Sequence, residues 1–280
     1  MKTHTKLFVL LSLVIIVMTI FQGLGINRSA DEASSIPKED FLICMFFTGG
    51  LKEIAENSIQ TLKHLGLSKK LVVTALDDEA YFHTRNLGVK VEKRQTNHER
   101  ITRAGTRSFR AINANKFDIV LNLLQKEKRI VVYADPDVVF LEDISYDVVK
   151  FRESNYDVMI QNDVGRFDEN DKTYLCAGFI FLKPNDKTME LLNVTQNKIV
   201  QRHLDDQLTL NKELNEKGNG ISYDVFDLRD YPNGKRYFDH VETIFKEFRP
   251  NIVHNNYLHT TNEKIARMKK HGLWFLPLQK

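Results

Sequence analysis

Two aspartates on either side of a proline, Asp135-Pro136-Asp137, are the residues whose types and spacing most clearly suggest chemistry in this sequence. They follow the apolar run Ile130–Ala134, which is typical of a buried strand. Ligands of open α/β sheets bind beyond the carboxyl ends of strands, and the proline stiffens the turn. Two carboxylates at this spacing can both reach one divalent cation, Mn²⁺ or Mg²⁺, and such an ion holds a diphosphate well. An ordinary Asp-Pro-Asp turn is the alternative interpretation.

The elements around this pair alternate between strands and helices. In the first half, apolar runs predict strands at 41–47, 71–76 and 129–134, and apolar stripes at helical spacing predict helices at 51–65 and 109–124. This alternation indicates a parallel, doubly wound α/β sheet. The second half is more mixed, with strands predicted at 157–160, 174–182, 221–226 and 252–254 and helices at 185–200 and 204–216. We therefore expect one α/β domain over residues 41–280, with a nucleotide-binding front half and a substrate-binding back half.

In this setting the strand and its aspartate pair resemble the metal site of GT-A-fold nucleotide-sugar glycosyltransferases. The sequence is similar, over roughly residues 41–275, to the nucleotide-diphospho-sugar transferase family that includes plant arabinosyl-, xylosyl- and galactosyltransferases. Besides the aspartate pair, the matching motifs are, in order, Leu71–Asp77, Lys116, Ala177-Gly178-Phe179, Asp206-Gln207, Val253–Tyr257 and Lys264 before Gly272-Leu273-Trp274. The resemblance implies a GT-A-like fold, a Rossmann-like mixed sheet flanked by helices. It also implies transfer of a sugar from a nucleoside diphosphate donor, with UDP expected, to a hydroxyl of a glycan or protein, with retention.

The resemblance also implies a role for each matching residue. Asp135, Asp137 and His254 would hold the cation, and the imidazole favours Mn²⁺ because it accepts nitrogen more readily than Mg²⁺ does. Lys116, Gly178 and Lys264 would contact the donor. Asp206 and Gln207 would lie beside the anomeric carbon, where a carboxylate stabilises an oxocarbenium-like state, as a nucleophile or by assisting same-face attack.

Each of these roles has a structural alternative. His254 can be an ordinary hydrogen-bonded loop histidine, and Asp205 and Asp206 can be helix caps. If the helix that Asp206 opens is only structural, Asp163 and Asp227 are the next carboxylates to consider.

Three more residues are candidate donor ligands. Thr48, with Gly49-Gly50, ends the first strand and could bring backbone N–H groups to the nucleotide. Asp77 ends the second strand, where a contact to base or ribose and a turn role with Asp78 are both open. Arg107 belongs to a cation-rich stretch, residues 90–116, that could meet the diphosphate, although a solvated surface is the usual explanation of such a run.

The N-terminus predicts a membrane anchor. Leu7 to Ile26 is a stretch of 20 residues without a charge, long enough to cross a bilayer as a helix, and Lys2 and Lys6 precede it. We expect a type II protein with a cytosolic tail (1–6), a signal anchor (7–26), a stem (27–40) and a lumenal domain in the Golgi or another secretory compartment. This agrees with the resemblance, since family members are typically anchored in this way. A cleaved signal peptide is the alternative.

The composition of the chain excludes several classes of protein. Lys and Arg number 40 against 37 Asp and Glu, a net charge of +3 that gives no case for nucleic acid binding. The two cysteines, Cys44 and Cys176, exclude a disulfide scaffold and a Cys-rich zinc site. Free buried thiols are expected, and a bridge between the two in an oxidising lumen is the alternative. The expected partners are a nucleotide-sugar donor, a glycan or glycoprotein acceptor and the membrane. A non-catalytic glycan-binding module on the same fold and a metal-dependent nucleotide-sugar hydrolase remain alternatives.

Overall fold

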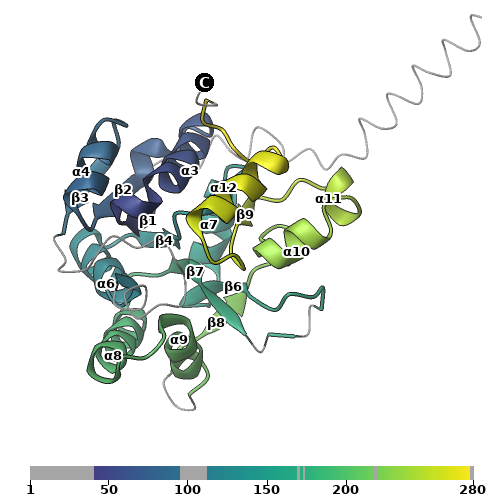
Figure 1. Ribbon diagram of the computed structural model, residues 1–280. Helices are drawn as coiled ribbons and strands as arrows, with labels where there is room; N and C mark the ends of the chain where they lie inside the picture. The colour runs from purple at the N-terminus through teal and green to yellow at the C-terminus, as the bar shows by residue number, and fades with distance from the viewer. Residues whose placement is uncertain (1–40, 95–111, 169–170, 173, 217–219, 278–280) are drawn as a thin grey trace, which may run out of the picture. The chain divides into compact units, whose positions relative to one another are not determined.

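The computed structural model describes residues 41–94, 112–168, 171–172, 174–216 and 220–277, which belong to one compact unit (Figure 1). The predicted tail, anchor and stem, residues 1–40, lie outside this part of the chain. Within the described ranges, no helix has both the length and the apolar composition that a membrane crossing requires.

The main sheet has the strand order β3-β2-β1-β4-β7-β6-β8. Its strands are β1 (Phe41–Phe47), β2 (Leu71–Ala75), β3 (Lys90–Lys93), β4 (Ile130–Ala134), β6 (Val158–Asn162), β7 (Leu175–Leu182) and β8 (Tyr223–Val225). Strands β3, β2, β1 and β4 are parallel, as expected for the front half, whereas β7 runs antiparallel to both β4 and β6. The sheet is therefore mixed, which agrees with a GT-A-like architecture.

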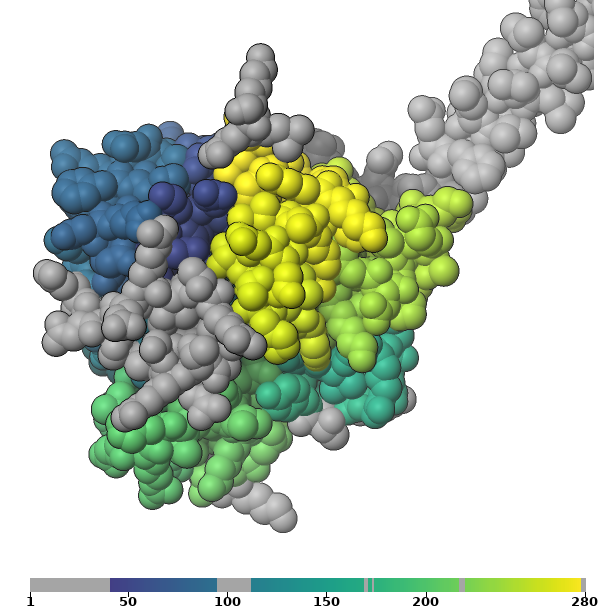
Figure 2. Space-filling model, in the orientation of Figure 1, coloured from purple at the N-terminus to yellow at the C-terminus, as the bar shows by residue number. Residues whose placement is uncertain are grey.

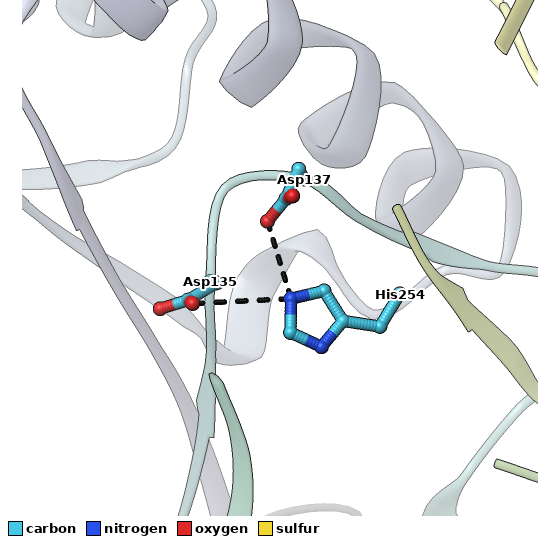
Figure 3. Close-up of side chains that lie close together, drawn as sticks. All are labelled: Asp135, Asp137 and His254. Atoms are coloured by element: carbon cyan, nitrogen blue, oxygen red, sulfur yellow. Dashed lines mark ion pairs between the residues drawn. The ribbon is translucent and has the colours of Figure 1, made fainter. Parts of the chain in front are cut away.

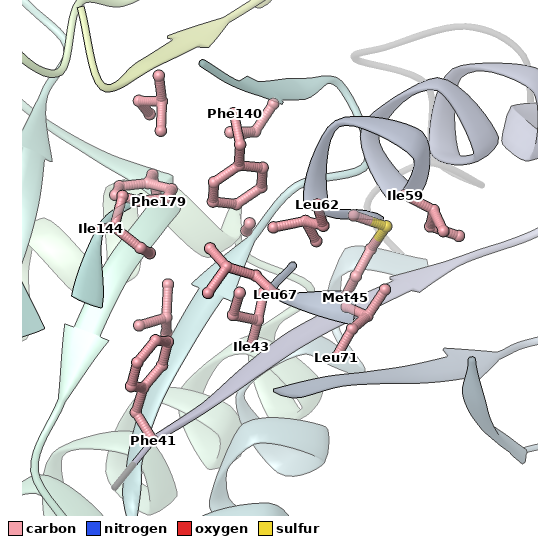
Figure 4. Packing of buried hydrophobic residues seen from close by; sticks show 14 of the residues in the cluster. Phe41, Ile43, Met45, Ile59, Leu62, Leu67, Leu71, Phe140, Ile144 and Phe179 are labelled. Carbon is pink, nitrogen blue, oxygen red and sulfur yellow. The ribbon is translucent and has the colours of Figure 1, made fainter. Parts of the chain in front are cut away.

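Strand β1 explains why the front strands are unbroken apolar runs. Phe41, Ile43 and Met45 pack on one face of the sheet, against α3 among other elements (Figure 4). The alternating residues Leu42 and Cys44 pack on the opposite face. Strands that are buried on both faces need apolar residues at every position rather than at every second one.

Helices cover both faces of this sheet. On the first face lie α3 (Lys52–His64), α4 (Asp78–Arg85) and α7 (Ser145–Glu153), and on the second lie α6 (Lys116–Glu127), α8 (Asp186–Arg202) and α9 (Asp206–Leu214). Two short 3₁₀ helices, Gly49–Leu51 and Ser68–Lys70, precede α3 and β2. The helix predicted at 109–124 is α6, which begins at Lys116, and residues 109–111 lie outside the described chain.

A second, two-stranded sheet pairs β5 (Val138–Phe140) with β9 (Ile252–His254) in antiparallel fashion. It shares a hydrophobic cluster with α10 (Gly234–Asp239), α11 (Ile244–Glu247) and α12 (Thr261–Lys270). Asn57 of α3 donates to the carbonyl of Leu273 at 3.0 Å, so the C-terminal segment lies against the start of the described chain (Figure 2). The pairing of β5 with β9 positions residues of the candidate site that the main sheet does not carry.

Candidate active site

The Asp135-Pro136-Asp137 segment forms a tight turn after β4. The N–H of Val138 donates to the carbonyl of Asp135 at 3.1 Å, which closes a turn with proline at its second position, where the fixed φ is favoured. The N–H of Asp135 donates to the carbonyl of Gly178 on β7 at 2.8 Å. The turn is therefore held between the main sheet and β5.

The β5–β9 pairing brings His254 to this turn. His254 lies opposite Val138 in the register, and the N–H of Asn255 donates to the carbonyl of Asp137 at 3.0 Å. The imidazole Nε2 of His254 is 3.4 Å from Asp137 Oδ1 and 3.9 Å from Asp135 Oδ2 (Figure 3). The three residues that the sequence predicted as metal ligands thus converge.

These three side chains fit a divalent cation. One ligand atom from each lies within 4.8 Å of the others. Gly178 leaves room beside them, because a Cβ there would overlap the His254 ring and lie 2.6 Å from Asp135 Oδ2. Two carboxylate oxygens and one imidazole nitrogen are a donor set that suits Mn²⁺ and can also serve Mg²⁺.

A glutamine that sequence analysis missed fixes the orientation of His254. The Nε2 group of Gln161 donates to the carbonyls of Tyr231 at 3.0 Å and Pro232 at 3.1 Å, so its Oε1 must face the other way. That oxygen lies 2.8 Å from His254 Nδ1. Because an amide oxygen only accepts, Nδ1 carries a proton, which leaves Nε2 as the nitrogen that can bind a cation beside the aspartates.

Lys264 lies beside the same carboxylates. It belongs to α12, which begins with a capping box of Thr260 and Glu263, and its Nζ is 2.6 Å from Asp137 Oδ2. Burial acts to raise the pKa of Asp137, but its neighbours Lys264 and His254 outweigh it and hold this pKa well below its usual value. Asp137 is therefore an anion ready to bind a cation.

Lys116 connects the turn to α9. Its buried Nζ is 2.7 Å from Asp206 Oδ2 and 3.5 Å from Asp135 Oδ1, and it donates to the carbonyl of Ala177 at 3.1 Å. Burial works to lower the pKa of Lys116, yet the two aspartates raise it above its ordinary value, so the amine stays charged. Asp135 also accepts from the hydroxyl of Tyr133 at 2.5 Å.

The three polar residues at the start of α9 have different partners. Asp205 caps the helix by accepting from the N–H of Leu208 at 3.0 Å, which is the capping role open to it from the sequence. Asp206 is paired with Lys116. Gln207 accepts from the N–H of Ala177 at 3.2 Å and donates to Asp163 Oδ2 at 2.9 Å, which holds its amide in one orientation.

Asp163 is a further carboxylate at this site, in a position that sequence analysis ranked behind Asp206. It follows β6 directly, as Asp135 follows β4, so its place at a strand end was the available signal. It is buried, with an exposed fraction of 7%, and burial raises its pKa. Asp227 is exposed and accepts from the N–H groups of Arg229 and Asp230 in a turn.

One cavity of about 250 Å³ collects these side chains. Its lining includes Lys116, Asp135, Asp137, Asp163, Asp206, Gln207, His254 and Lys264. Gly178 borders it through Asp135 and His254.

Two predicted donor ligands, Asp77 and Thr48, do not line this cavity. Asp77 caps α4 by accepting from the N–H of Ala80 at 2.8 Å, and it also accepts from the N–H of Gly49 at 2.9 Å. Thr48 is buried at the end of β1, before Gly49. Arg107 lies outside the described residues. Cations of the stretch 90–116 that lie within the described residues differ in position. Lys93 pairs with Asp78 on the surface, whereas Lys116 reaches the site.

Comparison with known proteins identifies related sequences. Residues 66–268 match the family model described as nucleotide-diphospho-sugar transferase. A UDP-galactose:fucoside alpha-3-galactosyltransferase of Dictyostelium discoideum is 24% identical over 291 residues, covering 85% of this chain and 44% of that protein. A UDP-D-xylose:L-fucose alpha-1,3-D-xylosyltransferase of Arabidopsis thaliana is 24% identical over 194 residues, covering 61% of this chain and 51% of that protein. The chain spans about half the length of these curated relatives.

Solved structures resemble the fold. A glycosyltransferase involved in glycosylation of the major capsid of PBCV-1 superposes with a TM-score of 0.53 at 12% identity, covering 82% of this chain and 98% of that one. The galactosyltransferase LgtC, in complex with donor and acceptor sugar analogs, gives a TM-score of 0.50 at 10% identity, covering 85% of this chain and 97% of that one. The fold is accordingly α/β and GT-A-like.

Proposed function

This chain belongs to the nucleotide-diphospho-sugar transferase family, and from that premise we propose that it is a metal-dependent glycosyltransferase. It would move a sugar from a UDP-sugar to a hydroxyl of a glycan or glycoprotein. The observation that carries the proposal is the convergence of Asp135, Asp137 and the lone pair of His254 within 4.8 Å, beside Lys264. A divalent cation held by these residues supplies charge neutralisation for a diphosphate.

The lysines of the site suit the same substrate. Lys264 lies next to the metal ligand Asp137, and Lys116 lies next to Asp135. When the carboxylates bind a cation, these two ammonium groups can meet phosphate oxygens as point charges. Asp206 is held in an ion pair with Lys116, so it is suited to stabilise positive charge on the sugar as the diphosphate departs rather than to act as a free nucleophile. We propose retention of configuration from the alpha linkages in the relatives' names.

The relatives also suggest an acceptor. Five of them carry fucose or fucoside in the acceptor place of their names, whereas their donors are UDP-galactose or UDP-xylose. The shared part is therefore the acceptor. We propose that this protein glycosylates a fucose residue, and that UDP-galactose and UDP-xylose are the first donors to test.

The experiment that tests the activity measures UDP release and product formation together. Purified protein is incubated with Mn²⁺, each UDP-sugar and p-nitrophenyl α-L-fucoside. We expect a glycosylated fucoside, loss of activity in EDTA, and recovery when Mn²⁺ is added back. Asp137→Asn should be inactive, and the matched control Asp143→Asn should be active, because Asp143 is exposed and accepts from the N–H of Ser145 in the following turn.

Two other outcomes would each favour a different function. UDP release without transfer to any acceptor of a glycoside panel would favour a nucleotide-sugar hydrolase. No UDP release with any donor would favour a glycan-binding module and would reject the enzymatic proposal.

We also propose that residues 7–26 anchor the protein in a membrane of the secretory pathway, with the Golgi as the expected compartment and the catalytic domain in the lumen. Carbonate extraction of membranes that contain the full chain tests this. Retention in the membrane pellet supports an anchor, and release into the soluble fraction would reject it in favour of a cleaved signal.

A further inference from the structure

The carboxylate of Asp163 is buried in the cavity and has no cation in direct contact, although the charge of the buried Arg236 acts on it from a greater distance. Within the described chain, no ion pair with a nitrogen–oxygen distance up to 4.0 Å includes Asp163. Its neighbours differ from those of Asp137, which is paired with Lys264, and of Asp206, which is paired with Lys116. A buried carboxylate that lacks an ion partner is costly, and such groups concentrate where a ligand binds.

Neutral amides hold this carboxylate. Asn256 Nδ2 donates to Oδ1 at 2.9 Å, Asn233 Nδ2 donates to Oδ1 at 3.4 Å, and Gln207 Nε2 donates to Oδ2 at 2.9 Å. A carboxylate has about four lone-pair sites and no donor of its own. Three of them are taken, so Asp163 has room for about one more hydrogen bond, which suits a hydroxyl group better than a metal ion.

The loop that carries Asp163 is fixed from behind by Arg236. This side chain is completely buried, and its guanidinium donates to the carbonyls of Asn162 at 3.4 Å and Arg166 at 3.3 Å and to the carbonyl of Val164. Three carbonyls of one loop on one guanidinium leave the loop little freedom. The carboxylate is therefore held in place before any ligand arrives.

Two tyrosines complete the surroundings of Asp163. Tyr174 and Tyr257 line the same cavity, and the hydroxyl of Tyr257 donates to the backbone carbonyl of Asp163. Tyr257 has a φ of 63°, in the left-handed region that a residue of this type rarely adopts, and its ring is half exposed. Aromatic faces beside a hydrogen-bond acceptor suit a sugar, whose C–H groups can lie on a ring while its hydroxyls donate.

We propose that Asp163 binds a hydroxyl group of the acceptor sugar, beside the rings of Tyr174 and Tyr257. The inference rests on the proposed function. A carboxylate that forms no direct ion pair would repel a diphosphate, so Asp163 does not serve the charged part of the donor. Lys264, Lys116 and the metal ligands already suit that part.

The test separates the acceptor from the donor. Asp163→Asn and Asp163→Ser are compared with wild type and with Asp227→Asn, a turn aspartate that lies outside the cavity lining. The serine variant is needed because an asparagine would turn its own N–H₂ toward a donor, either Gln207 or Asn256. Three quantities are measured: the KM for p-nitrophenyl α-L-fucoside, the rate of UDP release in water without acceptor, and the affinity for Mn²⁺ alone from electron paramagnetic resonance.

We expect the KM for the fucoside to rise about 10- to 100-fold in both Asp163 variants, the range for one hydrogen bond to a charged group. UDP release without acceptor and Mn²⁺ affinity should stay within about twofold of wild type, which also shows that the variants are folded. Asp227→Asn should match wild type in all three measurements.

Two results overturn this assignment while the proposed function stands. In the first, the wild type transfers sugar, but both Asp163 variants lose donor hydrolysis together with transfer. That result would place Asp163 at the donor. The second is an unchanged KM for the fucoside in both variants. A wild type that releases no UDP from any donor instead overturns the proposed function, and the acceptor site with it.

Discussion

At the scale of single residues, the amide of Gln161 decides which nitrogen of His254 faces the aspartates. Its two backbone acceptors, the carbonyls of Tyr231 and Pro232, leave its oxygen for Nδ1. Two substitutions isolate this effect. Gln161→Met and Gln161→Glu both remove the N–H groups that donate to the two carbonyls, but only Gln161→Met also removes the side-chain oxygen that faces His254. We expect Gln161→Met to weaken Mn²⁺ binding about 10- to 100-fold and Gln161→Glu to retain most of the affinity. Calorimetric titration with Mn²⁺ measures both, and equal losses in the two variants would remove Gln161 from the site.

Cys44 yields a second prediction at this scale. Burial, and to a lesser extent the charge of Glu92, raises the pKa of its thiol to about 12, whereas an unfolded cysteine titrates near ~8.5. Above that lower value the unfolded chain releases a proton that the folded chain keeps, so this thiol lowers stability as pH rises, by about 1.4 kcal/mol per pH unit. The difference in free energy of unfolding between wild type and Cys44→Ala should therefore shrink between about pH 9 and 11. Urea denaturation at several pH values tests it, and a constant difference would contradict it.

At the scale of elements, the approach of β7 to the turn after β4 depends on Gly178. An alanine Cβ would overlap the His254 ring and crowd Asp135, so Gly178→Ala should weaken Mn²⁺ binding at least about tenfold and lower stability by about 1–3 kcal/mol. Gly165→Ala is the control, since its Cβ meets the flexible side chain of Lys235. Thermal unfolding and Mn²⁺ titration of both variants give the answer, and a fully competent Gly178→Ala protein would show that the gap is wider than the geometry indicates.

Strands that are buried on both faces were predictable from the sequence, and most short or polar elements were not, although the three-residue strands β8 and β9 were. Strands β1, β2, β4 and β9 were found because unbroken apolar runs mark them. Strand β3 was missed, since Lys-Val-Glu-Lys is a charged edge strand, and the aspartate turn therefore follows the fourth strand rather than the third. The helices α4, α7, α10 and α11 and strand β5 were not predicted either, because each is too short for a clear period.

The candidate site divides in the same way. Asp135, Asp137 and His254 could be proposed because each lies at the end of an apolar strand. Gln161 could not, because its partners are backbone carbonyls and one imidazole from distant parts of the chain, and no local pattern reports them. Asp77 illustrates the opposite error, since a strand-end aspartate can be committed to capping a helix.

At the scale of the whole molecule, a bound cation would join the two sheets. Asp135 follows the main sheet, and His254 ends the two-stranded sheet. A ligand that binds the native state at 100 times its Kd adds about 2.7 kcal/mol. For a domain of this size that corresponds to a rise in Tm of roughly 5–10 °C. Scanning calorimetry with and without Mn²⁺ checks this, with Asp137→Asn expected to show no rise and Asp143→Asn the full rise.

The antiparallel pairing of β5 with β9 determines when during synthesis the three candidate metal ligands can first meet. A ribosome delivers residues in order, so Asp135 and Asp137 emerge long before His254 and Lys264 have been added. Until β9 arrives, Val138–Phe140 has no strand partner, and an unfinished chain holds the two aspartates without their histidine. Closing so long a stretch of chain is a slow, late step of folding. Nascent chains and chains cut short before β9 therefore cannot bring His254 to the two aspartates.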